Sequence, residues 1–343
     1  MRSTHPALGT PPRRHKRTFT TNIRVIIRRM ELRRLALLHE LSHRGTITAV
    51  AQALSYSHSS VSVQLAELEK EAGIALLRRV GRNVELTAAG RRLARHAEQA
   101  LAADEAVRTE LAALADVPRG LVRMTSVQTP AIALLPEAFK RLAAIAPEVK
   151  VDVIHRETAP GLDDLRSNAA DFVLGVEYDP LLVARRREIH RQDLMREDIL
   201  VALPGDHPAA SQPGPVRLAA LENAIWATGR PGTGLDAFLR NVCNQMAGYE
   251  PDIGHRSDDA IVLIALVEAG RAVALLPSMF TPATASVITR PIQEGRLQRT
   301  VLTAARQTSS NAPAITAIRQ AFQQTGRHLA EHRQDVEISP QAW

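Results

Sequence analysis

Residues 45–69 have the sequence GTITAVAQALSYSHSSVSVQLAELE, which predicts two short helices separated by a tight turn. Gly45 is a natural C-terminal cap for a helix that precedes it, because glycine readily adopts a left-handed backbone. The first of the two helices is expected at residues 49–54. Three apolar residues share one face of the second helix, at the spacing of an α-helix: Val61, Leu65 and Leu68.

The flanking sequence extends this pattern to three helices and a hairpin. Leucines recur at helical spacing from Leu32 to Leu41, which predicts a first helix that ends near Gly45. After the third helix, the sequence Gly81-Arg82-Asn83 is a hairpin turn signal. Three short helices followed by a small hairpin are the layout of a winged helix-turn-helix, which we place at residues 30–88.

A long helix is expected next, as a linker at residues 89–118. Seven of its positions alternate four and three residues apart, and all but one are apolar: Leu93, Ala97, Ala100, Asp104, Val107, Leu111 and Leu114. Such a heptad seam suits pairing with a second copy of the same helix. The sequence therefore predicts a homodimer that forms through this helix.

Strand-like and helix-like segments alternate beyond residue 120, which is typical of βαβ units around a parallel sheet. Their order predicts an α/β domain at residues 119–330 with two lobes. Lobe I is expected at residues 119–195 and 290–330, and lobe II at residues 196–289. A cleft between two such lobes is a common place for a small ligand. Residues 331–343 have no periodicity and are expected to be a tail.

Charge is distributed unevenly along the 343 residues, whose net charge is +7. Residues 1–30 carry eight Lys and Arg and no acidic residue, residues 31–95 have a net charge of +4, and the remainder has a net charge of −5. The basic N-terminal quarter would attract a polyanion. Aromatic residues make up only 3% of the chain, which disfavours modules that stack unpaired bases. Double-stranded DNA is therefore the expected partner.

The composition also argues against several locations and site types. The longest aliphatic run, residues 261–267, is far too short to span a bilayer. Residues 1–29 are basic and proline-containing but lack a secretory signal, so we expect a disordered extension, with Met30 as a candidate start codon. The single Cys243 forms no intrachain disulfide and no multi-thiolate metal site. We expect a cytoplasmic protein with no membrane partner.

Residues 30–90 resemble the DNA-binding domain of LysR-type transcriptional regulators. The resemblance rests on motifs in the right order and spacing: Met30-Glu31-Leu32, Gly45-Thr46-Ile47-Thr48-Ala49-Val50-Ala51, Ser60-Val61-Ser62-Val63-Gln64-Leu65, Leu68-Glu69, Arg79 with Arg82, and Leu86-Thr87-Ala88-Ala89-Gly90. Weaker motifs, such as Leu134-Leu135-Pro136 and Gly270-Arg271-Ala272-Val273, extend it to about residue 325. It implies a two-lobed, periplasmic-binding-protein-like effector domain of the α/β class, and a homotetramer built from two dimers.

The chain departs from the family pattern at two motifs. Where the family often has Gln-Pro, this chain has His58-Ser59, a change that affects which bases are read. Where the family often has Phe, this chain has Leu77, a core substitution of modest consequence.

The second helix of a helix-turn-helix lies in the major groove, with its N-terminal side chains facing base edges and phosphates. Serine hydroxyls here would contact DNA, and Gln64 has the amide that pairs with adenine. Thr48 and Arg82 would bind the backbone from the preceding turn and from the wing. The alternative is that the serines only cap a surface helix. The predicted DNA-binding residues are Thr48, Ser57, His58, Ser59, Ser60, Ser62, Gln64 and Arg82.

Candidate effector contacts come from turns that precede helices in the two lobes. The glycine-rich segment at residues 229–234 precedes a helix, so its amides could bind an anion, or it is only a flexible connection. The hydroxyl-rich turn at residues 125–130 is the equivalent in the other lobe. Because such turns line the effector pocket in the family, the resemblance implies effector-binding roles for Ser126, Gln128, Thr129, Thr158, Thr233 and Ser257. Two helix N-terminal turns that face a cleft would suit a small carboxylate.

Two further features have a functional and a plain interpretation. His39-Glu40-Leu41-Ser42-His43 matches the zinc-protease pattern of two histidines four residues apart with a glutamate between them. The plain interpretation, two surface histidines near the end of the first helix, fits the leucine face of that helix better. Cys243 is expected to be a buried inert thiol rather than a redox sensor, since no second cysteine is present to resolve an oxidised form.

These observations predict a sequence-specific DNA-binding regulator whose promoter binding is modulated by a small anionic or carboxylate effector. We expect no catalytic residue, no metal site and no cofactor. An effector-independent general DNA-binding protein is the first alternative. A zinc hydrolase that uses His39 and His43 is the second.

Overall fold

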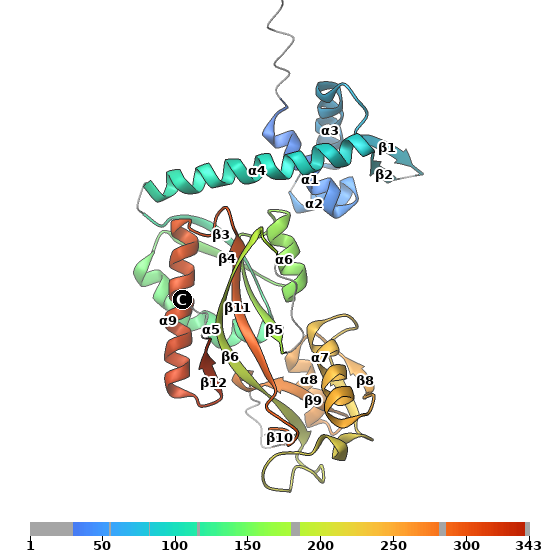
Figure 1. Cartoon of the computed structure of the whole chain (residues 1–343), viewed down its shortest axis with the longest axis vertical. Helices are drawn as coiled ribbons and strands as arrows, with labels where there is room; N and C mark the ends of the chain where they lie inside the picture. The colour runs from blue at the N-terminus through green and yellow to red at the C-terminus, as the bar shows by residue number, and fades with distance from the viewer. Residues whose placement is uncertain are drawn as a thin grey trace, which may run out of the picture. The chain divides into compact units, whose positions relative to one another are not determined.

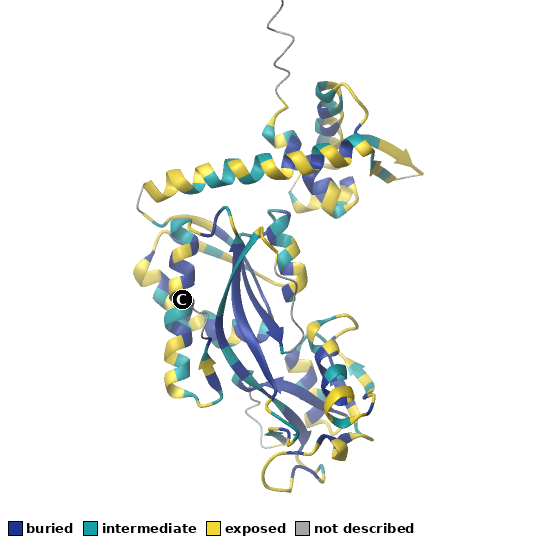
Figure 2. Cartoon of the chain, viewed as in Figure 1, coloured by how far each residue is buried: buried dark blue, intermediate teal, exposed yellow. Residues whose placement is uncertain are grey.

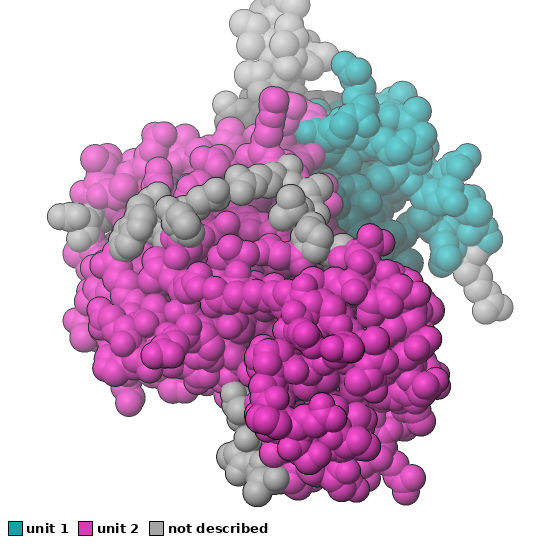
Figure 3. Space-filling view, turned by 60° about the horizontal axis from the view of Figure 1, so that its bottom comes forward, with its two compact units in different colours: residues 1–95 teal, residues 96–343 magenta. Residues whose placement is uncertain are grey.

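A computed structural model describes residues 30–54, 56–81, 83–114, 117–179, 186–280 and 286–339. The chain divides into two compact units, residues 1–95 and residues 96–343 (Figure 3). The expected basic extension, residues 1–29, lies outside the described residues, as does Arg82.

The first unit is built on three helices, α1 (Leu32–Arg44), α2 (Ile47–Ala53) and α3 (His58–Ala72). Gly45 ends α1 with φ of 75°, the left-handed conformation expected of this cap. The hydroxyl of Thr46 accepts a hydrogen bond from the amide of Ala49 at 3.2 Å and so begins α2. Apolar faces of the three helices form the core, which includes Leu35, Leu38, Leu41, Val50, Val61, Leu65 and Leu68.

A two-stranded hairpin completes the winged layout that the sequence predicts. Strands β1 (Leu77–Val80) and β2 (Asn83–Leu86) pair in antiparallel fashion and lead into the long helix α4 (Ala88–Leu114). Gly90 at the start of α4 lies against the hairpin, and a Cβ there would be only 2.1 Å from the carbonyl oxygen of Leu76. The close approach of backbone to backbone therefore requires glycine at this position.

The sheet of lobe I in the second unit contains three parallel strands. Strands β3 (Gly120–Ser126), β4 (Val149–His155) and β5 (Phe172–Tyr178) are parallel, with β3 in the middle. Side chains on one face of β5 pack in a cluster with helices α5 (Gln128–Ile145) and α9 (Pro313–His332). Val173 on the other face packs with Leu165 of α6 (Thr158–Arg166). All seven residues of β5 are buried because helices cover both faces (Figures 1 and 2).

Two antiparallel strands complete the sheet and join the lobes. Strand β11 (Gln298–Arg306) pairs with β5 and with β6 (Ile189–Pro204). The long strand β6 then continues into lobe II, where it pairs with β9 (Val273–Pro277) and β10 (Val287–Arg290). The sheet order is β4-β3-β5-β11-β6-β9, followed by β7 (Ile225–Thr228) and β8 (Asp252–Arg256). The lobe boundary that we placed at residue 195 thus falls inside one continuous strand.

Lobe II has its own parallel set. Strand β7 (Ile225–Thr228) lies between β9 and β8 (Asp252–Arg256), parallel to both. Helices α7 (Gly234–Val242) and α8 (Ala260–Glu268) follow β7 and β8 in the chain, with a π-turn, η3 (Cys243–Ala247), after α7. Short 3-10 turns, η2 (Leu218–Leu221) and η4 (Ser278–Phe280), complete the lobe. Trp226 and Phe238 are fully buried in its core.

The segment after α9, which we expected to be a tail, is partly structured. Strand β12 (Val336–Ile338) pairs with β6 opposite Met195, Arg196 and Glu197. Val336 is buried in the main core, which explains why this segment folds onto lobe I. None of the helices in the described ranges combines the length and the apolarity that crossing a membrane requires.

Candidate functional site

The N-terminus of α3 presents a polar, exposed surface. The hydroxyl of Ser57 caps the helix by accepting a hydrogen bond from the amide of Ser60 at 3.1 Å, and it lies 3.0 Å from the hydroxyl of Ser59. Ser57, His58, Ser59 and Ser62 are exposed, and Thr48 is exposed on the neighbouring helix α2. The capping role that we weighed for the serines is real for Ser57, while the other hydroxyls remain accessible.

Gln64 differs from these residues because it is part of a side-chain network. Its Oε1 accepts a hydrogen bond from Nε of Arg34 at 2.9 Å, and Arg34 also forms an ion pair with Glu71. Reading adenine through both amide atoms would therefore make the Gln64 oxygen accept from Arg34 and from the base together. The other DNA-binding candidate, Arg82, lies outside the described residues.

The His39–His43 segment packs within the first unit. His39 and Glu40 are buried, and the Glu40 carboxylate lies 2.6 Å from the Nε of Arg44. The rings of His39 and His43 meet edge to face with centroids 4.6 Å apart. Neither belongs to a three-residue group of metal-ligating atoms among the described residues. This geometry argues against a zinc site, but it corrects the expectation of two surface histidines, because only His43 is exposed while His39 packs in the core of the unit.

A pocket lies between the two lobes of the second unit. Lobe I contributes Val127, Gln128, Thr129, Glu157, Tyr178 and Arg299. Lobe II contributes Gly229, Thr233, Leu235, Ser257, Asp258, Ala260, Leu263, Leu275, Leu276 and Pro277. The lining thus combines an apolar floor from β9 and α8 with polar groups that converge from both lobes, as in small-molecule sites.

Four of the six predicted effector contacts line this pocket: Gln128, Thr129, Thr233 and Ser257. Ser126 and Thr158 are not among its lining residues. The Ser126 hydroxyl donates to the carbonyl of Val127 at 3.0 Å. The Thr158 hydroxyl bonds to the backbone of Val176, donating to its carbonyl at 2.9 Å and accepting from its amide at 2.8 Å. Both hydroxyls therefore form hydrogen bonds with the backbone beside the pocket.

Two helix N-termini from opposite lobes reach the pocket without a capping side chain. Helix α5 begins after Val127 and helix α7 begins after Thr233, and in the described chain neither residue forms a side-chain cap. The Thr233 hydroxyl instead donates to the carbonyl of Arg230 at 2.8 Å. The first amides of both helices are thus available to an anion, and both helix dipoles favour negative charge there.

No short sequence motif indicates the buried guanidinium of the pocket. Arg299 on β11 is 1% exposed, and its Nη2 lies 2.7 Å from the carboxylate of Glu197 on β6 and 2.7 Å from the hydroxyl of Thr129. Burial alone would lower the pKa of the Arg299 guanidinium, but the Glu197 carboxylate and Tyr178 outweigh it, so this pKa lies above its ordinary value. A permanent positive charge is thus held at the wall of the pocket.

Two carboxyl groups face the pocket from opposite lobes. Burial raises the pKa of Glu157, and the nearby Asp258 carboxylate raises it further. Asp258 forms an ion pair with Arg230 and accepts a hydrogen bond from the Arg230 amide at 2.9 Å. These groups could accept hydrogen bonds from a ligand, and no short sequence motif identified them.

Cys243 is buried at the end of α7. Burial raises the pKa of its thiol to about 11. At neutral pH the thiol is therefore protonated, which matches the inert cysteine that we expected.

Comparison with known proteins agrees with this architecture. A family model described as "LysR substrate binding domain" matches residues 115–327, and one described as "Bacterial regulatory helix-turn-helix protein, lysR family" matches residues 32–91. The chain belongs to the family of LysR-type transcriptional regulators. It is a DNA-binding transcriptional regulator with an effector-binding domain, and members of this family are not enzymes.

Individual relatives match this chain over most of its length. The chain is 28% identical to the transcriptional dual regulator GltC of Bacillus subtilis over 274 residues, which are 79% of this chain and 89% of GltC. A full-length OxyR variant from Pseudomonas aeruginosa superimposes with a TM-score of 0.63 at 20% identity, covering 85% of this chain and 94% of OxyR. Full-length CbnR complexed with its target DNA superimposes with a TM-score of 0.51 at 22% identity, covering 86% and 100%.

Proposed function

We propose that this protein binds specific promoter sequences through α3 and that a small carboxylate in the interlobe pocket modulates this binding. The observation that carries the effector proposal is the pair of uncapped helix N-termini, α5 and α7, that meet in one pocket from opposite lobes. Because DNA is its target, we place the protein in the cytoplasm.

Most of the proposed DNA contacts lie in the first half of α3. We assign base and phosphate contacts to Ser57, His58, Ser59, Ser60, Ser62 and Gln64, and backbone contacts to Thr48 and Arg82. The solved complex of CbnR with its target DNA supports a direct interaction of this kind.

The proposed effector is a small carboxylate that also carries a hydrogen-bond donor. Amides at the starts of α5 and α7 would bind its carboxylate, close to the positive charge of Arg299. Glu157 and Asp258 would then accept hydrogen bonds from a hydroxyl or amino group on the same molecule. We keep Gln128, Thr129, Thr233 and Ser257 as direct contacts, and Ser126 and Thr158 as residues that shape the turns beside the pocket.

The proposed mechanism is a shift between closure states of the two lobes. An effector that binds one state better shifts the population toward it. In a dimer joined through α4, the shift would change how the paired DNA-binding units are spaced on their half-sites. Val107, Leu111 and Leu114 of the predicted seam are exposed in the single chain, which supports pairing through this helix, and we propose that two dimers form a homotetramer.

Selection of genomic fragments on the purified full chain, at near-physiological salt, tests the DNA-binding proposal. We expect enrichment of a few sites that contain an interrupted palindrome. The double variant Ser60→Ala/Gln64→Ala should weaken binding to such a site. The expected loss is about 1–3 kcal/mol for each hydrogen-bonded contact between a side chain and a base that the variant removes. Ser211→Ala/Gln320→Ala, which removes the same residue types from exposed positions of the second unit, is the matched control. Uniform recovery of fragments would instead support the general DNA-binding alternative.

A ligand panel tests the effector proposal separately. Thermal unfolding of the full chain would be followed with hydroxy acids, amino acids and dicarboxylates, and with the corresponding amides as uncharged controls. We expect a rise in Tm with one carboxylate class and no rise with its amide. Stabilisation by an amide and its acid alike would contradict binding at the helix N-termini.

A further inference from the structure

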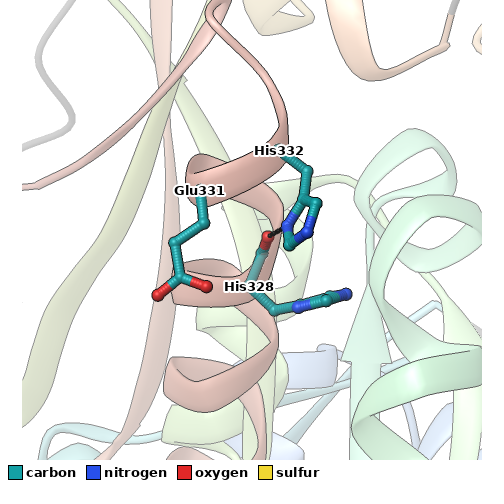
Figure 4. A group of neighbouring side chains, drawn as sticks. All are labelled: His328, Glu331 and His332. Carbon is teal, nitrogen blue, oxygen red and sulfur yellow. Dashed lines mark hydrogen bonds between the residues drawn. The ribbon is translucent and has the colours of Figure 1, made fainter.

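Three potential metal ligands lie together at the end of α9, far along the chain from the DNA-reading helix. Figure 4 shows His328, Glu331 and His332 on the last turns of this helix. One ligand atom from each residue lies within 4.8 Å of the others, and all three side chains are exposed. The spacing of three and four residues places them on one helical face.

The hydrogen bonding of His332 prepares it for metal binding. Its Nδ1 lies 2.7 Å from the carbonyl oxygen of His328. Since a carbonyl oxygen only accepts, Nδ1 carries the proton and Nε2 keeps its lone pair. Histidine ligands of metals usually donate the other ring N–H to such an acceptor, which fixes both the tautomer and the ring orientation. The two imidazole rings are already close, with centroids 4.5 Å apart.

The electrostatic setting also favours a cation. His332 is the last residue of α9, so the group lies at the negative end of the helix dipole. The next residue, Arg333, forms an ion pair with Asp335 at 2.7 Å, so the Asp335 carboxylate compensates its positive charge.

We propose that His328, Glu331 and His332 bind one divalent transition-metal ion of the zinc class. Two imidazoles and one carboxylate are a recurrent ligand set for zinc, and imidazole ligands select transition metals over magnesium or calcium. Two histidines four residues apart on one helical face are close enough to bind the same ion. Water would take the remaining coordination position. This site shares no residue with the effector pocket or with the predicted DNA-binding residues.

Isothermal titration of the chelator-treated full chain with ZnCl2 tests the proposal. We expect one zinc ion per chain and a higher Tm in the presence of zinc. His328→Ala/His332→Ala should abolish this binding, and Glu331→Gln should weaken it by about tenfold. Because the three side chains are exposed, the variants should keep the circular dichroism spectrum of the native chain.

The matched control is His43→Ala/His96→Ala, which removes two exposed histidines from α1 and α4. This variant should bind zinc as the native chain does. Unchanged zinc binding in the His328→Ala/His332→Ala variant, loss of binding in the control, or no binding by the native chain would each overturn the proposal.

Discussion

Gln128 of lobe I and Asp259 of lobe II are joined by a hydrogen bond of 2.9 Å from Nε2 to Oδ1. The Oε1 of the same Gln128 amide accepts from the backbone amide of Ala260 at 2.8 Å. One side chain of lobe I thus helps to cap α8 of lobe II, together with the Asp259 carboxylate, which accepts from the amide of Ile261 at 2.8 Å. Because Gln128 also lines the pocket, a ligand that displaces it would release this link between the lobes.

Replacing Gln128 with alanine should loosen the start of α8. Hydrogen exchange at the Ala260 amide should become faster, because this amide loses its acceptor. The amides of Ala321 and Phe322 in the buried part of α9 serve as the internal control and should exchange as in the native chain. Unchanged exchange at Ala260 would show that Asp259 caps the helix without help from Gln128.

The same variant should change the titration of Asp259. The hydrogen bond from Gln128 is the main reason why the pKa of Asp259 lies below its ordinary value, while burial opposes the shift. Asp259 therefore contributes stability that is complete above its ordinary pKa and is lost as the pH falls through the lowered value. In Gln128→Ala the pKa of Asp259 should move back toward 3.8, a change that NMR titration of its carboxyl carbon measures.

Removing the charge of Arg299 should destabilise the second unit. Arg299→Leu leaves Glu197, which is 0% exposed, as a buried carboxylate without its ion-pair partner, and should lower the free energy of unfolding of the second unit by about 3–5 kcal/mol. The double variant Arg299→Leu/Glu197→Leu should lose less than the single variant, because no charge is left buried. Urea denaturation measures both.

The exposed pair of Arg78 and Glu85 on the wing is a control for this result. Their side chains are 64% and 49% exposed and lie 2.7 Å apart. Arg78→Leu should cost less than about 1 kcal/mol, because solvent screens the pair. Equal losses for the buried and exposed pairs would contradict the role of burial.

Asp171 should make the stability of lobe I depend on pH in the acid range. Burial alone would raise the pKa of Asp171, but hydrogen bonds from Arg123, at 2.8 and 3.0 Å, and from Arg306, at 2.9 Å, outweigh it, so the pKa is lowered. The folded chain thus binds this proton less tightly than the unfolded chain does. The resulting stability is complete above the ordinary value of 3.8 and is lost as the pH falls through the lowered value.

Asp171→Asn should therefore lower the free energy of unfolding by about 2 kcal/mol at pH 7, and the difference from the native chain should shrink in acid. Asp206→Asn, at an exposed position of lobe II, is the matched control and should change little. Denaturant unfolding at several pH values measures both. A difference that stays constant down to pH 3 would show that the charge of Asp171 is not what stabilises the lobe.

Local periodicity predicted most helices and strands, and its failures have physical reasons. Helix α5 begins at Gln128, before the apolar run at residues 131–135, because its first two residues are polar and line the pocket. Strand β6 is much longer than the apolar segment at residues 199–203. Its first half carries charged residues that form ion pairs across the sheet, such as Arg191 with Glu177 at 2.6 Å.

The two candidate sites differ in how far apart their residues lie in the sequence. The predicted DNA-binding residues lie within one local motif, so spacing alone was enough to predict a shared surface for them. The pocket depends on residues that are far apart in sequence, and Arg299 is separated from Glu197 by 102 positions. No local sequence pattern predicts such an ion pair, since each partner alone is an ordinary charged residue in a strand. The turns at Gln128 and Thr233 were found because a polar turn before a helix is itself a local signal.

The thiol of Cys243 should resist alkylation in the folded chain. Its side chain is 0% exposed, and burial raises its pKa to about 11, so little reactive thiolate is present at neutral pH. Iodoacetamide should modify it quickly in urea and only slowly in the native state, with mass spectrometry as the measurement. Hydrogen peroxide should likewise leave DNA binding unchanged, and Cys243→Ala should bind DNA like the native chain. Rapid native alkylation together with a peroxide-dependent change in DNA binding would instead identify Cys243 as a redox sensor.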